Sequence, residues 1–172
     1  TFEPVFDRES TLSIGAIAIA RTNANIVWVG TGDAYTSRSS YSGDGVYKST
    51  DAGATWTNMG LADTQHIAKI AIHPRDPNVV YVAAMGRLYS RNSERGVYKT
   101  TDGGATWKKL LFVNDGVGVI DLAMDPADAN ILYAATYDKD RMPWQIVNGG
   151  PGSGIYKSTD AGATWVKLGG GL

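Results

Sequence analysis

Short apolar segments alternate with turn residues along the whole chain, and the same set of segments occurs three times. Within residues 13–20, Ile17 and Ile19 fall on one side of a strand and three alanines fall on the other. The next two units repeat this alternation around Ile70 and Leu122. A period of two indicates β-strands, and a bulky face opposite a small face is expected where sheets stack against one another.

The first unit predicts four antiparallel strands bounded by turn residues. We expect them at residues 14–20, 26–32, 45–49 and 55–59. A four-stranded unit repeated at about 50 residues is typical of a β-propeller blade, whereas a β-solenoid, the alternative, usually has shorter coils. We therefore predict an all-β fold, a β-propeller portion of about three blades. The divisions are blades at 13–60, 66–112 and 118–169, preceded at 1–7 by the end of another blade.

One octapeptide joins the third and fourth strands of each unit: STDAGATW at 49–56, TTDGGATW at 100–107 and STDAGATW at 158–165. Its Asp can accept hydrogen bonds from turn amides, its Gly supplies a positive φ, its first hydroxyl ties the flank, and its Trp packs between sheets. Three copies at equivalent turns favour a structural role over catalysis or metal binding. The residues concerned are Ser49, Asp51, Gly53, Trp56, Thr100, Asp102, Gly104, Trp107, Ser158, Asp160, Gly162 and Trp165.

The octapeptide pattern S/T-x-D-x-G-x-T-W is the Asp-box, also called the bacterial neuraminidase repeat. Together with the runs VGTGDA, GDGVYKSTDAGATW, ERGVYKTTDGGATWKKLLFV and GPGSGIYKSTDAGATW, it resembles the sortilin-type, glycosyl-hydrolase-like propeller proteins of bacteria. The resemblance covers essentially the whole chain and implies that the Asp-box stabilises a hairpin away from the ligand site. Because the box occurs in sialidases, xyloglucanases and sortilin receptors, it implies a fold and not a reaction.

In a four-stranded antiparallel blade, the loop between strands two and three emerges on the side opposite the Asp-box. The segments 33–44, 85–95 and 137–153 lie on that side and are long and unequal, as expected of binding loops. Their aromatic and arginine side chains can stack on a sugar or bind a carboxylate, although aromatics that fold back and arginines that pair with nearby Asp are the alternative. The candidate binding residues are Tyr35, Arg38, Tyr41, Arg87, Tyr89, Arg91, Arg141 and Trp144.

The sequence gives less evidence for a catalytic site than for binding loops. A glycosidase needs two carboxylates about 5 to 10 Å apart, and the spacing of the loop carboxylates selects no pair. We therefore expect a non-catalytic binding or assembly propeller that presents its loops to a protein or glycan; the alternative is a glycoside hydrolase of the Asp-box propeller type. The carboxylates available for that alternative are Asp33, Asp44, Glu94, Asp138 and Asp140.

Charge and composition exclude several other functional classes. A net charge of -1 gives no basic surface for nucleic acid, and no apolar run approaches the roughly 20 residues of a membrane span. The sequence has no Cys, and His66 and His73 fall at opposite ends of a blade, so we expect no metal and no cofactor. Lys69 and Asp121 occupy equivalent inner strands and are expected to pair beside the central channel.

The expected partner is the remainder of the same propeller, or other chains that complete it. Propellers typically close with 4 to 8 blades, whereas this chain supplies three blades and, in TFEPVFD at 1–7, what looks like the end of an Asp-box hairpin and one more strand. The resemblance to exported bacterial propellers implies a periplasmic, extracellular or cell-surface location.

Overall fold

The computed structural model describes residues 2–35, 40–142 and 144–169, which form β-strands and one short 3-10 helix, Ala62–Thr64. No helix in these ranges is long and apolar enough to cross a membrane. The strands are β1 Ile14–Ile19, β2 Val27–Thr31, β3 Val46–Ser49, β4 Thr57–Asn58, β5 Ile67–Ile72, β6 Val80–Ala84, β7 Gly96–Thr100, β8 Lys108–Leu111, β9 Val117–Met124, β10 Leu132–Met142, β11 Gln145–Asn148, β12 Gly154–Ser158 and β13 Val166–Lys167.

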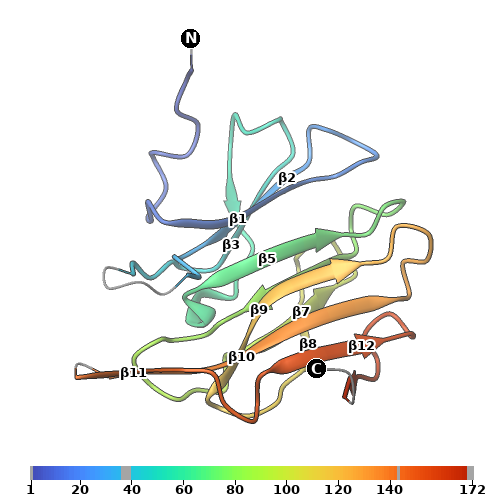
Figure 1. The fold of residues 1–172 in the computed structure, drawn as a ribbon. Helices are drawn as coiled ribbons and strands as arrows, with labels where there is room; N and C mark the ends of the chain where they lie inside the picture. The colour runs from blue at the N-terminus through green and yellow to red at the C-terminus, as the bar shows by residue number, and fades with distance from the viewer. Residues whose placement is uncertain (1, 36–39, 143, 170–172) are drawn as a thin grey trace.

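The strands form three antiparallel sheets that stack in chain order (Figure 1). The first sheet has the order β1-β2-β3-β4 and the second β5-β6-β7-β8, while in the third β10 pairs with β9, β11 and β12, and β12 pairs with β13. The innermost strands β1, β5 and β9 lie side by side. This arrangement confirms the predicted all-β fold with propeller blades, and the four strands of the first blade lie close to their predicted positions.

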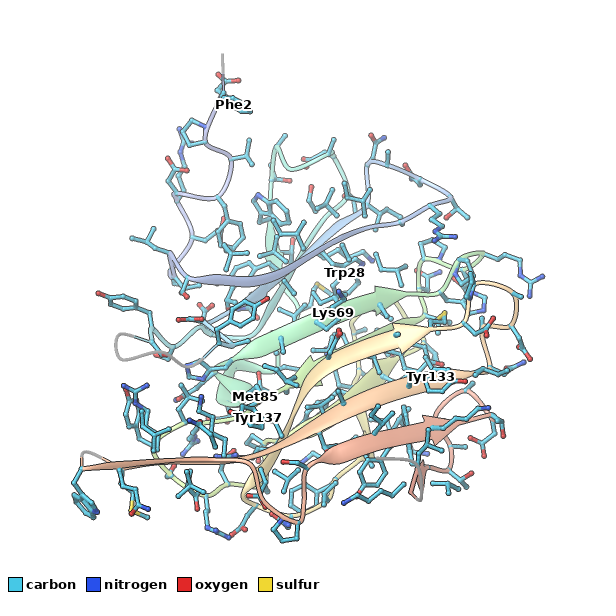
Figure 2. All side chains as sticks on the ribbon, viewed as in Figure 1. Phe2, Trp28, Lys69, Met85, Tyr133 and Tyr137 are labelled. Carbon is cyan, nitrogen blue, oxygen red and sulfur yellow. The ribbon has the colours of Figure 1, made fainter. Side chains whose placement is uncertain are left out.

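Alternating side chains of β6 explain why the sheets stack. Val80 and Val82 belong to the hydrophobic core between the first and second sheets, which also contains Trp28 (Figure 2). Tyr81 and Ala83 point the other way, into the core between the second and third sheets. The middle sheet is therefore buried on both faces, and its central strand is apolar throughout, as expected for a strand covered on both sides.

The two ends of each blade differ in what they carry. The first turn and the Asp-box lie together at one end, because an amide of each box donates to an asparagine carbonyl in the turn. These bonds are Ala52 N to Asn25 O, 3.0 Å, Gly103 N to Asn78 O, 3.0 Å, and Ala161 N to Asn130 O, 2.9 Å. The long loops lie at the other end with the links between blades, since Gly43 N donates to Gln65 O at 2.7 Å and Asn92 N to Asp115 O at 3.0 Å.

Each Asp-box uses its side chains as the sequence predicts. In the first box, Asp51 Oδ1 accepts from the amide of Thr55 at 2.8 Å and from Ser49 Oγ at 2.7 Å, while Asp51 Oδ2 accepts from Thr55 Oγ1 at 2.6 Å. The Gly53 amide donates to Ser49 Oγ at 2.8 Å, and Gly53 has a φ of 95°. The bonds from Thr55 and Ser49 lower the pKa of Asp51 to about 2. The same bonds recur around Asp102 and Asp160, so all three carboxylates are occupied by their own turns.

The N-terminal segment differs from the prediction. Residues 2–13 contain no strand, because Pro4 has no amide to donate and the chain turns back where Glu9 N donates to Phe6 O. Trp56 Nε1 nevertheless donates to Val5 O at 2.7 Å, and the Phe6 ring packs edge-on against Trp56 at 5.2 Å.

The segment 137–153 also differs, because most of it is a β-hairpin and not a loop. β10 is 11 residues long and continues past the sheet to pair with β11, with Lys139 opposite Asn148 and Met142 opposite Gln145. Figure 1 shows this hairpin projecting from the end of the blade that carries the long loops.

The predicted pair on the inner strands is present: Lys69 Nζ lies 3.8 Å from Asp121 Oδ1, and both side chains are about half exposed.

Candidate functional site

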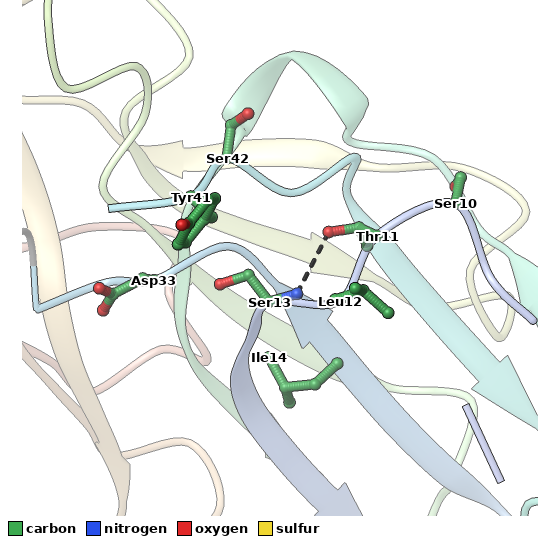
Figure 3. A pocket seen from close by; sticks show the side chains of 8 residues that line it. All are labelled: Ser10, Thr11, Leu12, Ser13, Ile14, Asp33, Tyr41 and Ser42. Carbon is green, nitrogen blue, oxygen red and sulfur yellow. Dashed lines mark hydrogen bonds between the residues drawn. The ribbon is translucent and has the colours of Figure 1, made fainter. Parts of the chain in front are cut away.

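A pocket of about 740 Å³ opens at the loop end of the first blade (Figure 3). One wall is the segment that leads into β1, and the other is the loop between β2 and β3. The residues that line the pocket are Ser10, Thr11, Leu12, Ser13, Ile14, Asp33, Tyr41 and Ser42. The lining thus combines hydroxyl groups, one carboxylate and one aromatic ring.

The backbone fixes the two most distinctive side chains of this pocket. The Asp33 amide donates to the Tyr41 carbonyl at 3.0 Å, which closes the loop between β2 and β3. Asp33 Oδ1 accepts from the amide of Tyr35 at 3.0 Å in a local turn. Gly32, with a φ of 89°, turns the chain out of β2 just before Asp33. Asp33 lines the pocket, and the bond from the Tyr35 amide holds its carboxylate in place.

A second carboxylate, Asp44, lies behind the pocket wall. It accepts from Tyr47 Oη at 2.7 Å, from Ser10 Oγ in a short hydrogen bond, and from Thr31 Oγ1 at 3.4 Å. Burial raises the pKa of Tyr47, so its hydroxyl stays protonated and keeps donating. This network fixes Ser10 in the wall.

The other loop carboxylates are engaged outside the pocket. Glu94 accepts from Ser93 Oγ at 2.6 Å and from Tyr98 Oη at 3.3 Å. Asp138 accepts from the Gly152 amide at 3.2 Å at the base of the hairpin. Among the described residues that line the pocket, Asp33 is thus the single carboxylate.

Two of the predicted arginines, Arg87 and Arg91, pair with carboxylates in different parts of the loop end. Arg91 lies 2.8 Å from Asp140 and 3.3 Å from Asp115, and these partners raise its pKa. Arg87 lies 2.9 Å from Asp63. These contacts join the loop between β6 and β7 to the links between blades and to the β10–β11 hairpin. They agree with the alternative stated above, in which the arginines pair with nearby Asp residues.

The predicted aromatic residues are exposed at the loop end. Tyr35 and Tyr41 do not fold back, Tyr89 packs with the Arg141 guanidinium 5.5 Å from its ring centre, and Trp144 is 79% exposed near the tip of the hairpin. A Trp this exposed does not anchor its own loop. Arg38 lies outside the described residues. Ligand binding by the eight candidate residues remains a prediction.

Two buried basic residues carry roles that sequence reasoning missed. Arg95 ends the long loop segment 85–95, yet it is fully buried and donates to the carbonyls of Gly116, Lys139, Arg87 and Ser90 at 2.6 to 3.3 Å. It joins its own loop to the link before β9 and to strand β10. The sequence feature that could have indicated this role is its position directly before the third strand of a blade, between Glu94 and the glycine that begins the strand.

His66, which lies directly before β5, is the second of these residues. It is buried, its Nδ1 lies 3.1 Å from the Gly86 carbonyl, and burial lowers its pKa although the nearby Asp33 carboxylate opposes that shift. Lys139 on β10 is also buried, burial lowers its pKa, and Asp33 again opposes. The Asp33 carboxylate therefore lies within electrostatic reach of basic groups from the second and third blades.

Curated relatives are similar to this chain over short parts of their own length. A xyloglucanase of Acetivibrio thermocellus is 32% identical over 112 residues, which cover 59% of this chain and 12% of the relative. A xyloglucanase of Paenibacillus sp is 28% identical over 172 residues, which cover 90% of this chain and 16% of the relative. Vacuolar protein sorting/targeting protein 10 of Sordaria macrospora is 31% identical over 103 residues, which cover 60% of this chain and 6% of the relative. The chain spans less than a fifth of each.

Solved structures share the fold. An ancestral GH74 enzyme matches with a TM-score of 0.66 and 21% identity, over 93% of this chain and 20% of the other. The GH74 xyloglucanase from Xanthomonas campestris matches with a TM-score of 0.62 and 19% identity, over 93% of this chain and 24% of the other. These matches support the assignment of the chain as a portion of a propeller.

The expected function is corrected by these relatives. The expectation of a non-catalytic binding or assembly propeller is wrong, because the similar proteins include several xyloglucanases. The glycoside hydrolase alternative agrees better with this finding. Aromatic and arginine side chains in the long loops had suggested binding, but aromatic rings also hold the sugar in a site that cleaves it.

The family model described as sortilin, neurotensin receptor 3 matches residues 44–171, which contain all three Asp-boxes. The match extends from the end of the first long loop through the third blade, and it confirms the resemblance to sortilin-type, glycosyl-hydrolase-like propellers. The chain belongs to the Sortilin-Vps10 family.

Proposed function

We propose that this chain is part of a glycoside hydrolase that acts on xyloglucan or a chemically similar polysaccharide. The observation that carries the proposal is the pocket beside Asp33 and Tyr41, in a chain whose similar proteins include xyloglucanases. The proposed activity is that of the full-length protein, because this chain spans less than a fifth of each curated relative described above.

The pocket has the chemistry that a neutral sugar requires. Sugar hydroxyls exchange hydrogen bonds with hydroxyl side chains, and Ser10, Thr11, Ser13 and Ser42 supply these groups. The apolar face of a sugar ring packs against an aromatic ring, which Tyr41 supplies. The lining contains no Lys or Arg among the described residues, so a neutral glycan fits better than an acidic one.

Asp33 is the residue to which we assign proton transfer. Among the described contacts, one of its oxygens accepts from the Tyr35 amide, and we propose that the other binds a glycosidic oxygen or a water in the pocket. Glycoside hydrolysis usually requires a second carboxylate about 5 to 10 Å away across the scissile bond. Asp44 is occupied by Tyr47, Ser10 and Thr31, and we therefore do not assign it that role.

We also place the protein outside the cytoplasm, because a polysaccharide of this kind lies outside the cell that degrades it. Whether the compartment is the periplasm, the cell surface or the medium is tested by fractionating cells and detecting the full-length protein. Recovery of all of it from the cytoplasm would contradict this placement.

The test of function is turnover of xyloglucan by the full-length protein, followed by the release of reducing ends. Asp33→Asn should lower kcat by about 100-fold or more, the loss expected when a general acid or base is removed. Tyr41→Ala should raise KM with a smaller effect on kcat, because it removes ring contacts from the bound sugar.

Asp128→Asn is the matched control, because this exposed carboxylate lies in a turn at the Asp-box end and binds its own neighbour Asn130. It should leave turnover unchanged. Absence of hydrolysis with xyloglucan and other β-glucans would refute the proposed function, and full activity of Asp33→Asn would refute the assignment of Asp33.

A further inference from the structure

His66 lies directly before β5, at the junction of three segments of the loop end. Its carbonyl accepts from the amide of Met85 at 2.9 Å, and its ring Nδ1 lies 3.1 Å from the carbonyl of Gly86. The carbonyl of its neighbour Gln65 accepts from the amide of Gly43 at 2.7 Å, in the loop between β2 and β3. This junction therefore connects the link before β5 with the loops that follow β2 and β6.

The junction is packed closely against the loop that forms one wall of the pocket. A Cβ at Gly32 would clash with the carbonyl oxygen of Gln65 and would lie 2.9 Å from the Cα of His66. Asp33 and Ser42, which belong to the same loop, line the pocket. A displacement of the junction would therefore displace this wall of the pocket.

The surroundings of the His66 ring favour its neutral form. The residue is 2% exposed. Because the Gly86 carbonyl can only accept, Nδ1 carries the hydrogen of the neutral ring. Nε2 is enclosed and contacts no hydrogen-bond partner among the described residues. A proton on Nε2 would therefore place a charge in a buried site, on an N–H group without an acceptor, which is a costly arrangement in a folded protein.

Charged groups on the neighbouring segments act on the ring in opposite directions. The buried guanidinium of Arg95, before β7, repels a charged imidazole, whereas the carboxylate of Asp33 attracts it. Arg87 and Asp63, on the loop after β6 and in the link before β5, pair with each other at 2.9 Å. Burial has the largest effect and lowers the pKa of His66, and the attraction to Asp33 offsets only part of that shift.

We propose that His66 is an acid-sensitive switch that holds the pocket wall in place while its ring is neutral. The neutral ring stays buried and binds the Gly86 carbonyl. A protonated ring leaves this site, so the junction opens and the loop that carries Asp33 and Ser42 loses its support. The switch acts whatever ligand the pocket binds, and it therefore goes beyond the proposed hydrolysis of a glycan.

The direction and the size of the effect follow from proton linkage. An opened junction exposes His66, whose ring then has its ordinary pKa of 6.5, whereas the closed junction binds the proton more weakly. Opening is therefore independent of pH well above 6.5 and becomes more favourable as the pH falls below it. With the closed form neutral throughout, the opening constant rises about 25-fold between pH 7 and pH 5. Carboxylates of ordinary pKa stay mostly ionised in this window.

The test is amide hydrogen exchange of the full-length protein between pH 5 and pH 7, followed by mass spectrometry. The amides of Met85 and Gly43 report on the junction, because they donate to carbonyls of the link before β5. Their opening constants, corrected for the intrinsic pH dependence of exchange, should rise about 5- to 25-fold from pH 7 to pH 5. The amide of Gly103 is the internal control, because it donates to Asn78 at the Asp-box end and should show no such rise.

His66→Gln should remove the pH dependence, because the Gln amide does not titrate in this range and can still donate to the Gly86 carbonyl. His73→Gln is the matched control, since His73 is the other His of these 172 residues. It accepts from the amides of Arg75 and Asp76 in a turn at the Asp-box end, so its replacement should leave the rise at Met85 and Gly43 unchanged.

A second measurement needs no variant. Hydrogen exchange at the imidazole C2 carbon, followed by mass spectrometry, gives the pKa of each His in the wild-type protein, and that of His66 should lie below 6.5. A His66 pKa at or above 6.5 would overturn the proposal. A rise below about fivefold at Met85 and Gly43, or an equal rise in wild type and in folded His66→Gln, would also overturn it. These readouts do not involve glycan turnover, so their failure is distinguishable from failure of the proposed function.

Discussion

Replacing Arg95 with Met tests whether one buried guanidinium organises the loop end of the propeller. The side chain is fully buried just before β7 and donates to carbonyls of its own loop, of the link before β9 and of strand β10. Met has a similar length and fills the space of the apolar stem, so the substitution removes the donors with little loss of volume.

The size of the expected loss of stability depends on which other hydrogen-bond donors each carbonyl keeps. Gly116 O also accepts from the Lys139 amide at 3.3 Å, and Arg87 O and Ser90 O also accept from Asn92 Nδ2 at 3.0 and 2.8 Å. Because these three carbonyls keep a second donor, the loss is smaller than that of four complete hydrogen bonds. Replacing Arg95 with Met should lower the free energy of unfolding by about 2 to 4 kcal/mol.

The assay is equilibrium unfolding in urea followed by tryptophan fluorescence, with limited proteolysis of the loop between β6 and β7. Arg95→Lys keeps the charge but has no planar fork, so it should lose less stability than Arg95→Met. Faster cleavage near Arg87 should accompany the loss in both variants. A change below about 0.5 kcal/mol in Arg95→Met, the range of ordinary surface substitutions, would refute this account of the loops.

Three further predictions address the Asp-boxes and the core. Asp102→Ala should lower the melting temperature while leaving the KM for the glycan unchanged, because Asp102 binds only its own turn among the described contacts; a change in KM at unchanged stability would contradict this. The bonds that lower the pKa of Asp51 and Asp160 to about 2 favour the folded state above the ordinary value of 3.8, so stability should fall as the pH drops from 3.8 to about 2, and a urea titration of Asp51→Asn should show a flatter decline. Gly104→Ala should destabilise the protein by about 1 to 3 kcal/mol, because Gly104 has a φ of 102° and a Cβ there would lie 2.7 Å from Trp28; unchanged thermal unfolding would refute the close packing.

Much of the fold could be predicted from local patterns. The period of two around Ile17, Ile70 and Leu122 identifies the inner strands, and turn chemistry identifies the Asp-boxes, because each acts within a few residues of sequence. The opposite ends of the blade follow from antiparallel order alone. The propeller architecture follows from the repeat, since each unit has two apolar faces to bury.

The candidate site was less predictable because its contacts join residues far apart in the chain. The bonds from Arg95 to Gly116 and Lys139 depend on the stacking of sheets, and the bond from Ser10 to Asp44 depends on how the segment before β1 folds onto its blade; sequence spacing reports neither. The β10–β11 hairpin was read as a loop because RMPWQ contains Pro and lacks alternation. Function was misjudged because loops that bind a glycan and loops that cleave it use similar residues.

The two-sided burial of β6 has a consequence for synthesis of the chain on the ribosome. The first sheet can form its own hydrogen bonds as soon as it emerges, but Trp28 and Val46 have no cover until β5 and β6 follow. Each nascent blade therefore exposes a hydrophobic surface for the time needed to translate one repeat. Slow codons at a blade boundary would prolong that exposure and favour aggregation.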